Sequence, residues 1–140
     1  LMADKFFHAP PPKSCGRDGF NMSWLSRFLS GNERPEDVQA TLTELTALTS
    51  AQAILQWCGH PDEVFVCGGG VHNAMLMARL QHHLPSCRIA STDFLGQPPD
   101  WGEAVAFAWL AWRTTKGCAG NLPAVTGARG PRILGAIYPA

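Results

Sequence analysis

Apolar side chains recur along this chain at two spacings, one typical of helices and the other of buried strands. Residues 35–57 carry them three or four positions apart, which predicts one long helix. Pro35 suits the first position of that helix, and Gly59 is placed to end it. Residues 64–66 form a short apolar run that predicts a strand covered on both faces, and residues 88–92 predict a second strand.

A further helix is expected between these two strands. Asn73 is a good N-cap for it, and apolar residues recur on one helical face in the stretch that follows. Strands and helices in alternation predict a parallel α/β unit, in which ligands bind at the carboxyl ends of the strands. This rule places Gly68–Gly70 and Asp93 at the same edge of the sheet.

The remaining segments are predicted to be less regular. Residues 1–19 are an irregular, proline-rich entry segment, and residues 120–140 are a tail rich in glycine and proline. Residues 20–28 have helical spacing, and residues 133–137 resemble a late strand. Residues 103–112 are apolar on every side, which predicts a helix buried in a core or an interface.

The amino-acid composition limits the kinds of binding partner that are expected for this chain. The chain has 140 residues, enough for one domain, and its eleven basic residues balance eleven acidic ones, which argues against binding to nucleic acid. No apolar run approaches the ~20 residues that span a bilayer, so no membrane partner is expected. Charged residues make up only 16% of the chain, so part of the surface is expected to face another domain or subunit, such as a homodimer partner.

The five cysteines are scattered and contain no CxxC pair, which argues against a zinc site. An odd number of cysteines, with no signal peptide before them, favours reduced thiols and a cytoplasmic location.

Gly68–Gly70 is the first candidate site, because three glycines leave the backbone open to a ligand at the start of a helix. A nucleotide-binding turn and a simple tight turn are equally compatible with it. The spacing Gly68-x-Gly70-x-x-Asn73 is also a broken dinucleotide fingerprint, with Asp93 near the position of a ribose-binding acid. The missing third glycine and the helix before the strand argue against a dinucleotide.

Asp93, Asp100 and Glu103 form the second candidate site. Carboxylates near the carboxyl end of a strand could hold Mg²⁺, orient a sugar hydroxyl or act as a base. Glu103 could equally complement the dipole of the helix that it begins. His72 has no partner visible in the sequence, and His83 lies on a polar helix face where solvation is expected.

Five stretches of the chain together resemble the anhydro-N-acetylmuramic acid kinase family. They are PPKSCGR at 11–17, DVQATLTELTA at 37–47, VCGGGVHN at 66–73, the TD…G…D..EAVAFA pattern at 92–108 and GNLPAVTGA at 120–128. They follow one another in one order over nearly the whole chain. Cys15 stands where the family usually has threonine.

The resemblance implies a kinase of the sugar-kinase, heat-shock and actin superfamily, built from two lobes of ribonuclease-H-like fold with ATP and Mg²⁺ in the cleft. Such enzymes phosphorylate 1,6-anhydro-N-acetylmuramic acid and open its anhydro ring with water, giving N-acetylmuramic acid 6-phosphate for cell-wall recycling. The residues carried over are Gly68, Gly69, Gly70 and Asn73 for ATP, Asp93 and Arg17 for the sugar, and Glu103 and Asp100 for catalysis.

The family's amino-terminal glycine motif and its catalytic aspartate are absent from these 140 residues. The chain therefore resembles an incomplete α/β lobe, the C-terminal part of the kinase, which is expected to need the N-terminal lobe as its partner and to be inactive alone. Another actin-like sugar kinase and a noncatalytic interaction fragment remain the alternatives.

Overall fold

The computed structural model describes residues 1–16 and 18–139, which form two compact units. The first unit contains residues 1–2 and 29–102, and the second contains residues 3–28 and 103–140. Each unit has its own helices and its own packing.

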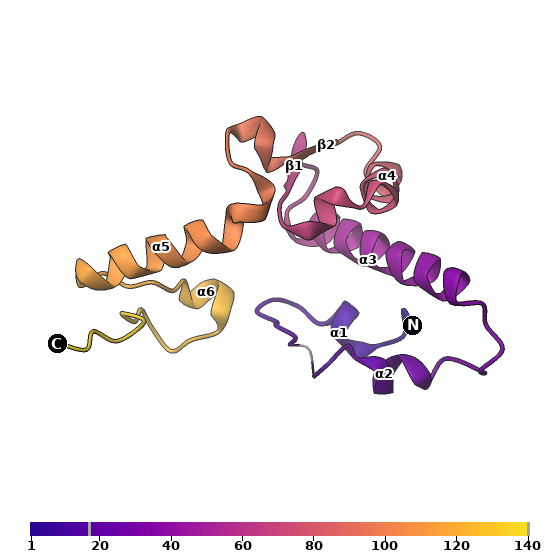
Figure 1. Cartoon of the computed structure of the whole chain (residues 1–140), viewed down its shortest axis with the longest axis horizontal. Coiled ribbons are helices and arrows are strands. Elements are labelled where there is room, and N and C mark those ends of the chain that lie inside the picture. The colour runs from indigo at the N-terminus through magenta and orange to yellow at the C-terminus, as the bar shows by residue number, and fades with distance from the viewer. Residues whose placement is uncertain (17, 140) are drawn as a thin grey trace. The chain divides into compact units, whose positions relative to one another are not determined.

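The first unit is a mixed α/β unit built around two short parallel strands (Figure 1). Strand β1 (Glu63–Val66) pairs with β2 (Arg88–Ser91), and Val64 lies opposite Ile89. Helix α3 (Pro35–Trp57) comes before β1, and α4 (Ala74–His83) connects the two strands. The predicted long helix, both strands and their parallel arrangement are confirmed.

Local sequence signals set the bounds of α3. Pro35 occupies its first turn together with the acidic residues Glu36 and Asp37, which complement the positive end of the helix. Several threonine hydroxyls donate to the carbonyl oxygen four residues earlier, a bond that adds little helical stability. Packing of one face must therefore hold this helix.

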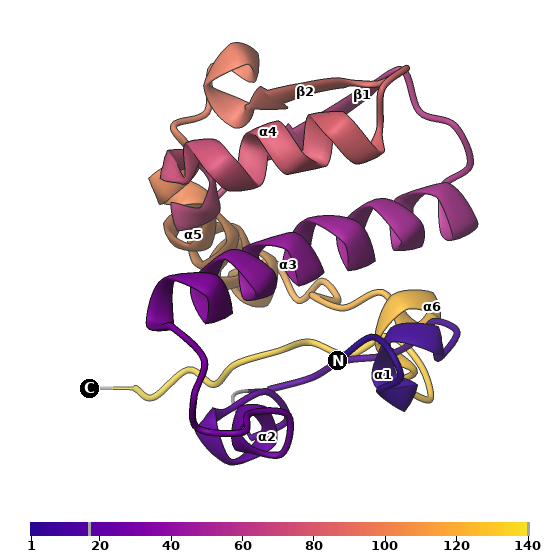
Figure 2. The same cartoon turned by 90° about the vertical axis from the view of Figure 1, so that its right-hand side faces the viewer.

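That packing forms the core of the first unit. Ala47 and Ala51 of α3 are fully buried, and Leu84, just after α4, is only 2% exposed. Ala51 and Leu84 pack with Val64 and Ile89 of the two strands. Because alanine is small, α3 can approach its neighbours closely, and Figure 2 shows α3 running alongside α4.

A charged cluster also joins α3 to α4. Glu44 of α3 accepts hydrogen bonds from Arg79 Nη2 at 2.9 Å and from His83 Nε2 at 2.7 Å. The bond from Arg79, followed by that from His83, lowers the pKa of Glu44 to about 2. The expectation that His83 is simply solvated was wrong, because its partner comes from a helix 39 residues earlier in the chain.

The second unit contains α1 (Lys5–His8) and α2 (Met22–Ser26), which lie beside a cluster of aromatic rings. The Phe20 and Trp24 ring centroids are 4.9 Å apart, and Trp24 Nε1 donates to Asp4 Oδ2 at 2.9 Å. Helix α2 begins later than the predicted 20–28 because Asn21 caps it, with its side chain accepting from the Trp24 amide at 2.9 Å.

Helix α5 (Gly102–Thr115) and the short helix α6 (Pro123–Thr126) complete the second unit. None of the residues of α5 is buried and Phe107 is 71% exposed, so the predicted burial in a core of this chain was wrong, while burial in an interface stays a prediction. An apolar face is covered only where another element packs against it. Helix α6 lies inside the tail that was expected to be irregular.

The prediction of a strand at residues 133–137 was also wrong, because residues 131–139 contain neither helix nor strand. The Leu134 carbonyl accepts a hydrogen bond from the Thr114 hydroxyl instead of from a neighbouring strand. Gly135 has a left-handed φ of 88°, which breaks the extended run.

Across the described residues, none of the helices combines the length and the apolar character that crossing a bilayer would need.

Candidate functional site

The carboxyl ends of β1 and β2 lie at one edge of the sheet, because the strands are parallel. Gly68–Gly70 comes just after β1, and Asp93 lies two residues after the end of β2. We call this edge, with Gly68–Gly70 and Asp93, the rim. The predicted placement of both segments at one edge is confirmed.

The glycine turn on the rim leaves space above its backbone. Gly68 has a left-handed φ of 78°, and its amide donates to the Pro99 carbonyl at 2.9 Å. A Cβ placed on Gly68 or on Gly69 would meet no atom within 4 Å. The chain then makes a single 3-10 turn, η1 (Gly69–His72), before α4 begins. The backbone at Gly68 and Gly69 is therefore accessible to a ligand.

Asn73 caps α4, as its sequence position predicts. Its side-chain Oδ1 accepts a hydrogen bond from the Leu76 amide at 3.1 Å. This bond satisfies one of the free amides at the beginning of the helix. It also fixes the direction in which the chain leaves η1.

His72 and Asp100 form a pair beside the glycine turn. His72 Nε2 lies 2.8 Å from Asp100 Oδ1 and 3.0 Å from Asp100 Oδ2. Asp100 comes from a second short 3-10 turn, η3 (Pro99–Trp101), which the Gly68–Pro99 hydrogen bond ties to the rim. Sequence reasoning missed the partner of His72, because 28 residues separate the pair and no local pattern connects them.

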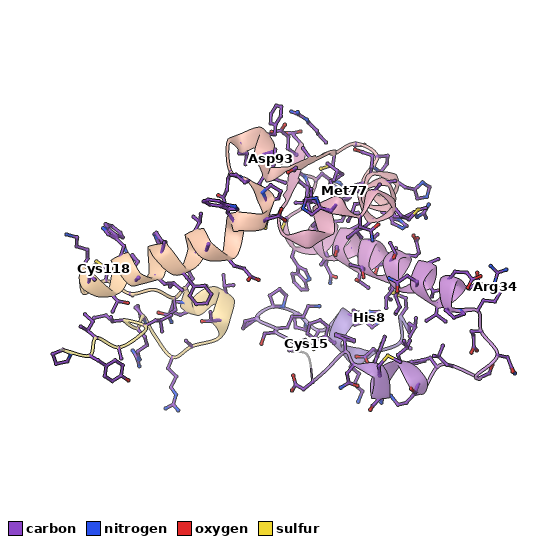
Figure 3. All side chains as sticks on the ribbon, viewed as in Figure 1. His8, Cys15, Arg34, Met77, Asp93 and Cys118 are labelled. Atoms are coloured by element: carbon purple, nitrogen blue, oxygen red, sulfur yellow. The ribbon has the colours of Figure 1, made fainter. Side chains whose placement is uncertain are left out.

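Asp93 lies just beyond β2 in η2 (Thr92–Leu95), with its side chain exposed (Figure 3). Its Oδ2 accepts a hydrogen bond from the Ser91 hydroxyl at 3.3 Å. The neighbouring Thr92 Oγ1 is buried and has no hydrogen-bonding partner within the described part of the chain. Such an unsatisfied group is unusual in folded proteins.

Glu103 belongs to the first turn of α5, in the second unit. Its carboxylate forms no hydrogen bond or ion pair with any residue of the described chain. Among residues 1–16 and 18–139, no three His, Cys, Asp or Glu side chains gather closely enough to hold a metal ion. The structure thus pairs Asp100 with His72 and Asp93 with Ser91, but it does not assemble a three-carboxylate metal centre.

Arg17, expected to contact the sugar, lies outside the described residues. Lys13, four residues earlier in the chain, is described. Lys13 Nζ donates to the carbonyls of Phe6 and Phe7, at 2.9 and 3.2 Å, so the ammonium group binds the end of α1.

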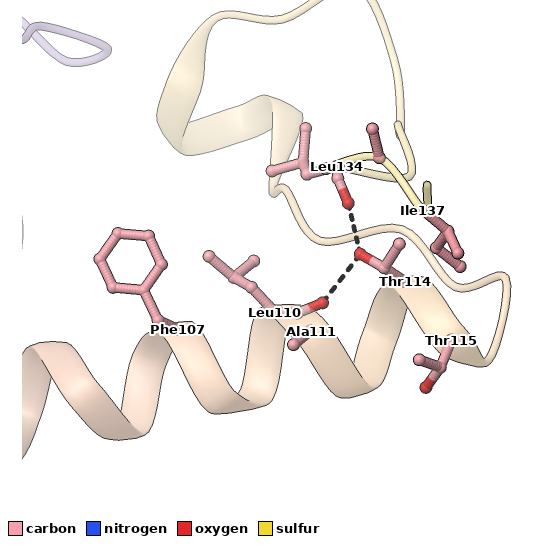
Figure 4. A pocket seen from close by; sticks show the side chains of 9 residues that line it. Phe107, Leu110, Ala111, Thr114, Thr115, Leu134 and Ile137 are labelled. Carbon is pink, nitrogen blue, oxygen red and sulfur yellow. Dashed lines mark hydrogen bonds between the residues drawn. The ribbon is translucent and has the colours of Figure 1, made fainter. Parts of the chain in front are cut away.

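A separate hollow of about 430 Å³ lies in the second unit, between the last turns of α5 and the segment after α6 (Figure 4). Phe107, Leu110, Leu134 and Ile137 make it largely apolar, and the Thr114 hydroxyl donates to the Leu110 carbonyl at 3.0 Å. None of its lining residues titrates. It therefore offers no carboxylate, imidazole or amine to act as a general acid or base.

Comparison with known sequences matches one family over the whole chain. The family profile described as anhydro-N-acetylmuramic acid kinase covers residues 1–140. Curated proteins of that name are 54% identical in Nitrosospira multiformis, 54% in Pseudomonas paraeruginosa and 50% in Chromohalobacter salexigens. These matches cover 99–100% of this chain but only 38–39% of the relatives. The chain thus spans less than two-fifths of their length.

Proposed function

The chain belongs to the anhydro-N-acetylmuramic acid kinase family, and from this premise we propose that it supplies the nucleotide side of an ATP-dependent sugar kinase. The match of the family profile to every residue from 1 to 140 carries this proposal. In the proposal, the first unit is part of an actin-like lobe with a ribonuclease-H-like fold. Its parallel strands, with ligand-facing segments at their carboxyl ends, support this assignment.

ATP binds along the glycine turn in this proposal. The open space above Gly68 and Gly69 supports it, because a side chain at either position would project where a ligand approaches. Asn73 and the first amides of α4 lie next to this surface and suit a polar or anionic group. This assignment replaces the dinucleotide interpretation, because a kinase of this family would use a nucleoside triphosphate rather than a dinucleotide.

Mg²⁺ fits the proposed site as a companion of the nucleotide. Magnesium keeps several waters and binds through one or two carboxylates plus substrate phosphates, so it needs no cage of three protein ligands. Asp100 is the best-supported carboxylate, because the His72 pair and the Gly68–Pro99 bond hold it beside the glycine turn. The metal supplies charge neutralisation for the phosphates.

The proposed reaction transfers the γ-phosphoryl group of ATP to O6 of 1,6-anhydro-N-acetylmuramic acid. Water adds to C1, the C1–O6 bond breaks, and a proton leaves the water, which gives N-acetylmuramic acid 6-phosphate and ADP. Glu103 is proposed to orient the sugar or the attacking water, and Asp93 and Arg17 to hold sugar groups. Positioning and neutralisation of charge are the main demands of phosphoryl transfer.

The partners of this chain follow from the same proposal. Three large apolar side chains of α5 are exposed, namely Phe107, Trp109 and Trp112, and clustered exposed apolar side chains mark interaction surfaces. We propose that the remainder of the kinase covers part of this surface, with a second subunit as a further candidate. The 140-residue chain alone is then expected to be inactive.

Mass spectrometry of the product tests the proposed function directly. The whole kinase, incubated with ATP and the anhydro sugar, is expected to yield a sugar phosphate one water heavier than the phosphorylated anhydro sugar. The 140-residue chain, assayed in parallel, is expected to yield none. A product that retains the anhydro ring would contradict the ring-opening step, and the absence of any sugar phosphate would contradict the kinase assignment.

A further inference from the structure

One of the stretches that carry the family resemblance, residues 37–47, has no role in the proposed site. It lies in α3, which contains none of the residues proposed to contact ATP or the sugar. Glu44, within this stretch, bonds to two side chains of α4, the helix that follows the glycine turn. The contact between α3 and α4 is therefore the route by which this stretch can affect the site.

Glu44 binds Arg79 in a geometry that fixes direction as well as distance. Arg79 Nη2 donates to Glu44 Oε1 at 2.9 Å, and Arg79 Nε donates to the other carboxylate oxygen, Oε2. A planar guanidinium that makes two parallel bonds to a carboxylate fixes the orientation of both groups, whereas an ammonium group makes only a point contact. His83, one helical turn after Arg79, places its Nε2 2.7 Å from Glu44 Oε1. We call these three side chains the Glu44 cluster.

The Glu44 cluster is partly withdrawn from water. The side chains of Glu44, Arg79 and His83 are 37%, 34% and 19% exposed. The bonds from Arg79 and His83 lower the pKa of Glu44 to about 2, so the carboxylate is ionised at neutral pH. Within the described chain, every side-chain hydrogen bond between α3 and α4 ends on Glu44. Apolar burial between the helices has no direction of its own, so this bond sets how α4 lies on α3.

Helix α4 and the glycine turn form one hydrogen-bonded structure. The Asn73 amide donates to the Gly70 carbonyl at 3.1 Å, and Asn73 Oδ1 accepts from the Leu76 amide at 3.1 Å. Leu76 Cδ2 lies 3.3 Å from the position that a Cβ on Gly70 would take, so the turn rests against the first turn of α4. Arg79 lies about 7.5 Å along the axis from Ala74, the first residue of α4. A rotation or slide of α4 would therefore displace the turn.

The last turn of α4 has a second attachment, which does not involve α3. Gln81 Nε2 donates to the carbonyls of Leu84 and Cys87, at 3.1 and 2.8 Å. The Ile89 amide donates to Gln81 Oε1 at 3.4 Å. All of these partners belong to the segment that directly follows α4. The Gln81 bonds thus fix the path of the chain into β2, whereas the Glu44 cluster fixes α4 on α3.

We propose that Glu44 and Arg79 are positioning residues for the nucleotide, because their bond holds α4 where the glycine turn contacts ATP. The proposal rests on the proposed function, since it takes the glycine turn as the ATP contact. Neither residue touches the nucleotide in this proposal; both act through α4. A hydrogen bond weakens steeply outside a narrow range of distance and angle, so a small displacement of the turn amides weakens their bonds to a ligand.

ATP binding by the whole kinase tests this proposal in two variants. Arg79→Lys keeps the charge but cannot make two parallel bonds, and Glu44→Gln keeps the size but loses the charge. Each is expected to weaken ATP binding about tenfold in the folded kinase, with sugar affinity unchanged. Glu63→Gln is the matched control, because Glu63 accepts from Arg88 Nη1 at 3.0 Å in the same unit without contacting α4. It is expected to bind ATP normally.

The double variant shows whether the two residues act through one bond. Because Arg79→Lys and Glu44→Gln break the same bond, the double variant should bind ATP about as weakly as either single variant. Losses that multiply would mean that the residues act separately, and would overturn the proposal. Hydrogen exchange provides a readout that needs no nucleotide. Exchange of the amides of residues 68–73 should be faster in Arg79→Lys than in wild type, with residues 63–66 of β1 unchanged.

The remaining outcomes separate this proposal from the proposed function. If the wild-type kinase binds ATP and both single variants bind it equally well, the positioning role is overturned while the proposed function stands. Unchanged exchange at residues 68–73 would also overturn the positioning role, as would equal losses of ATP and sugar affinity. A wild-type kinase that does not bind ATP would overturn the proposed function, and the positioning role with it.

Discussion

The core of the first unit and helix α5 of the second unit contain similar apolar side chains but bury them to very different extents. In the first unit, Ala47 and Ala51 are fully buried and Leu84 is 2% exposed. In the second unit, α5 is apolar on every side yet has no buried residue. The difference shows that apolar character predicts where burial is needed, whereas burial itself depends on a partner with a complementary face.

The first unit contains those partners within a short stretch of chain. Helices α3 and α4 and strands β1 and β2 lie within residues 35–91 and contact one another. Their polar contacts are also internal, as in the Glu44–Arg79 bond. This unit also carries the rim, so the candidate site lies on the better-packed part of the chain.

The largest expected effect concerns α5 and what covers it. Phe107→Ala should change the unfolding free energy of the 140-residue chain by no more than about 0.5 kcal/mol, as for exposed sites in general. In the whole kinase, the same change should cost about 3–5 kcal/mol if Phe107 is fully buried there. Denaturant unfolding of both proteins measures this difference. Equally small effects in the two would show that nothing covers this position.

Leu84→Ala is expected to destabilise the 140-residue chain as well as the whole kinase, because Leu84 is already buried within the first unit. It should cost about 2–5 kcal/mol, because truncation leaves a cavity among Ala51, Val64 and Ile89. The loss should be similar in the 140-residue chain and in the whole kinase. Unfolding midpoints in urea measure it, and a loss confined to the whole kinase would contradict an independent core in this unit.

Glu103→Gln tests whether the second unit contributes to chemistry. If Glu103 orients sugar or water, the amide should lower kcat by about 10²-fold, as for the loss of a proton-transfer group. If it only complements the dipole of α5, turnover should be nearly normal, and stability should fall by ~0.3–1 kcal/mol. Turnover and melting temperature of the whole kinase distinguish these outcomes. We expect the loss of kcat.

The smallest expected effect is the pH dependence of the Glu44 cluster. Hydrogen bonds from Arg79 and His83 lower the pKa of Glu44 to about 2 from 4.5, so the folded state favours its ionised form. The resulting stabilisation is fully present above pH 4.5 and is lost as the pH falls toward 2. Melting temperatures of wild type and Glu44→Gln should therefore converge over this range. A gap that stays constant would contradict this role of Glu44.

Much of the first unit could be predicted because its signals are local. Pro35, the apolar spacing after it and the short run at 64–66 specified a helix and a strand within a few residues of each other. The alternation of strands and helices then placed the glycine turn and Asp93 at one edge. Asn73 was recognised as a cap because the capping bond joins residues only three apart.

The pairs that depend on tertiary contact could not be predicted in this way. His72 meets Asp100 across 28 residues, and His83 meets Glu44 across 39, so only the fold reveals either pair. The prediction of a strand at residues 133–137 was wrong for a related reason, because an apolar run forms a strand only where another strand lies beside it.

The most direct test of the central claim, that the glycine turn of the first unit contacts ATP, is the nucleotide affinity of Gly69→Val in the whole kinase. Gly69 suits this test because its backbone is not left-handed and the space around it is open, so the new side chain disturbs only a ligand. Gly130→Val, in the second unit, is the control. We predict about tenfold weaker ATP binding or worse, with sugar affinity and melting temperature unchanged. Unchanged ATP affinity in a folded Gly69→Val kinase would contradict the claim.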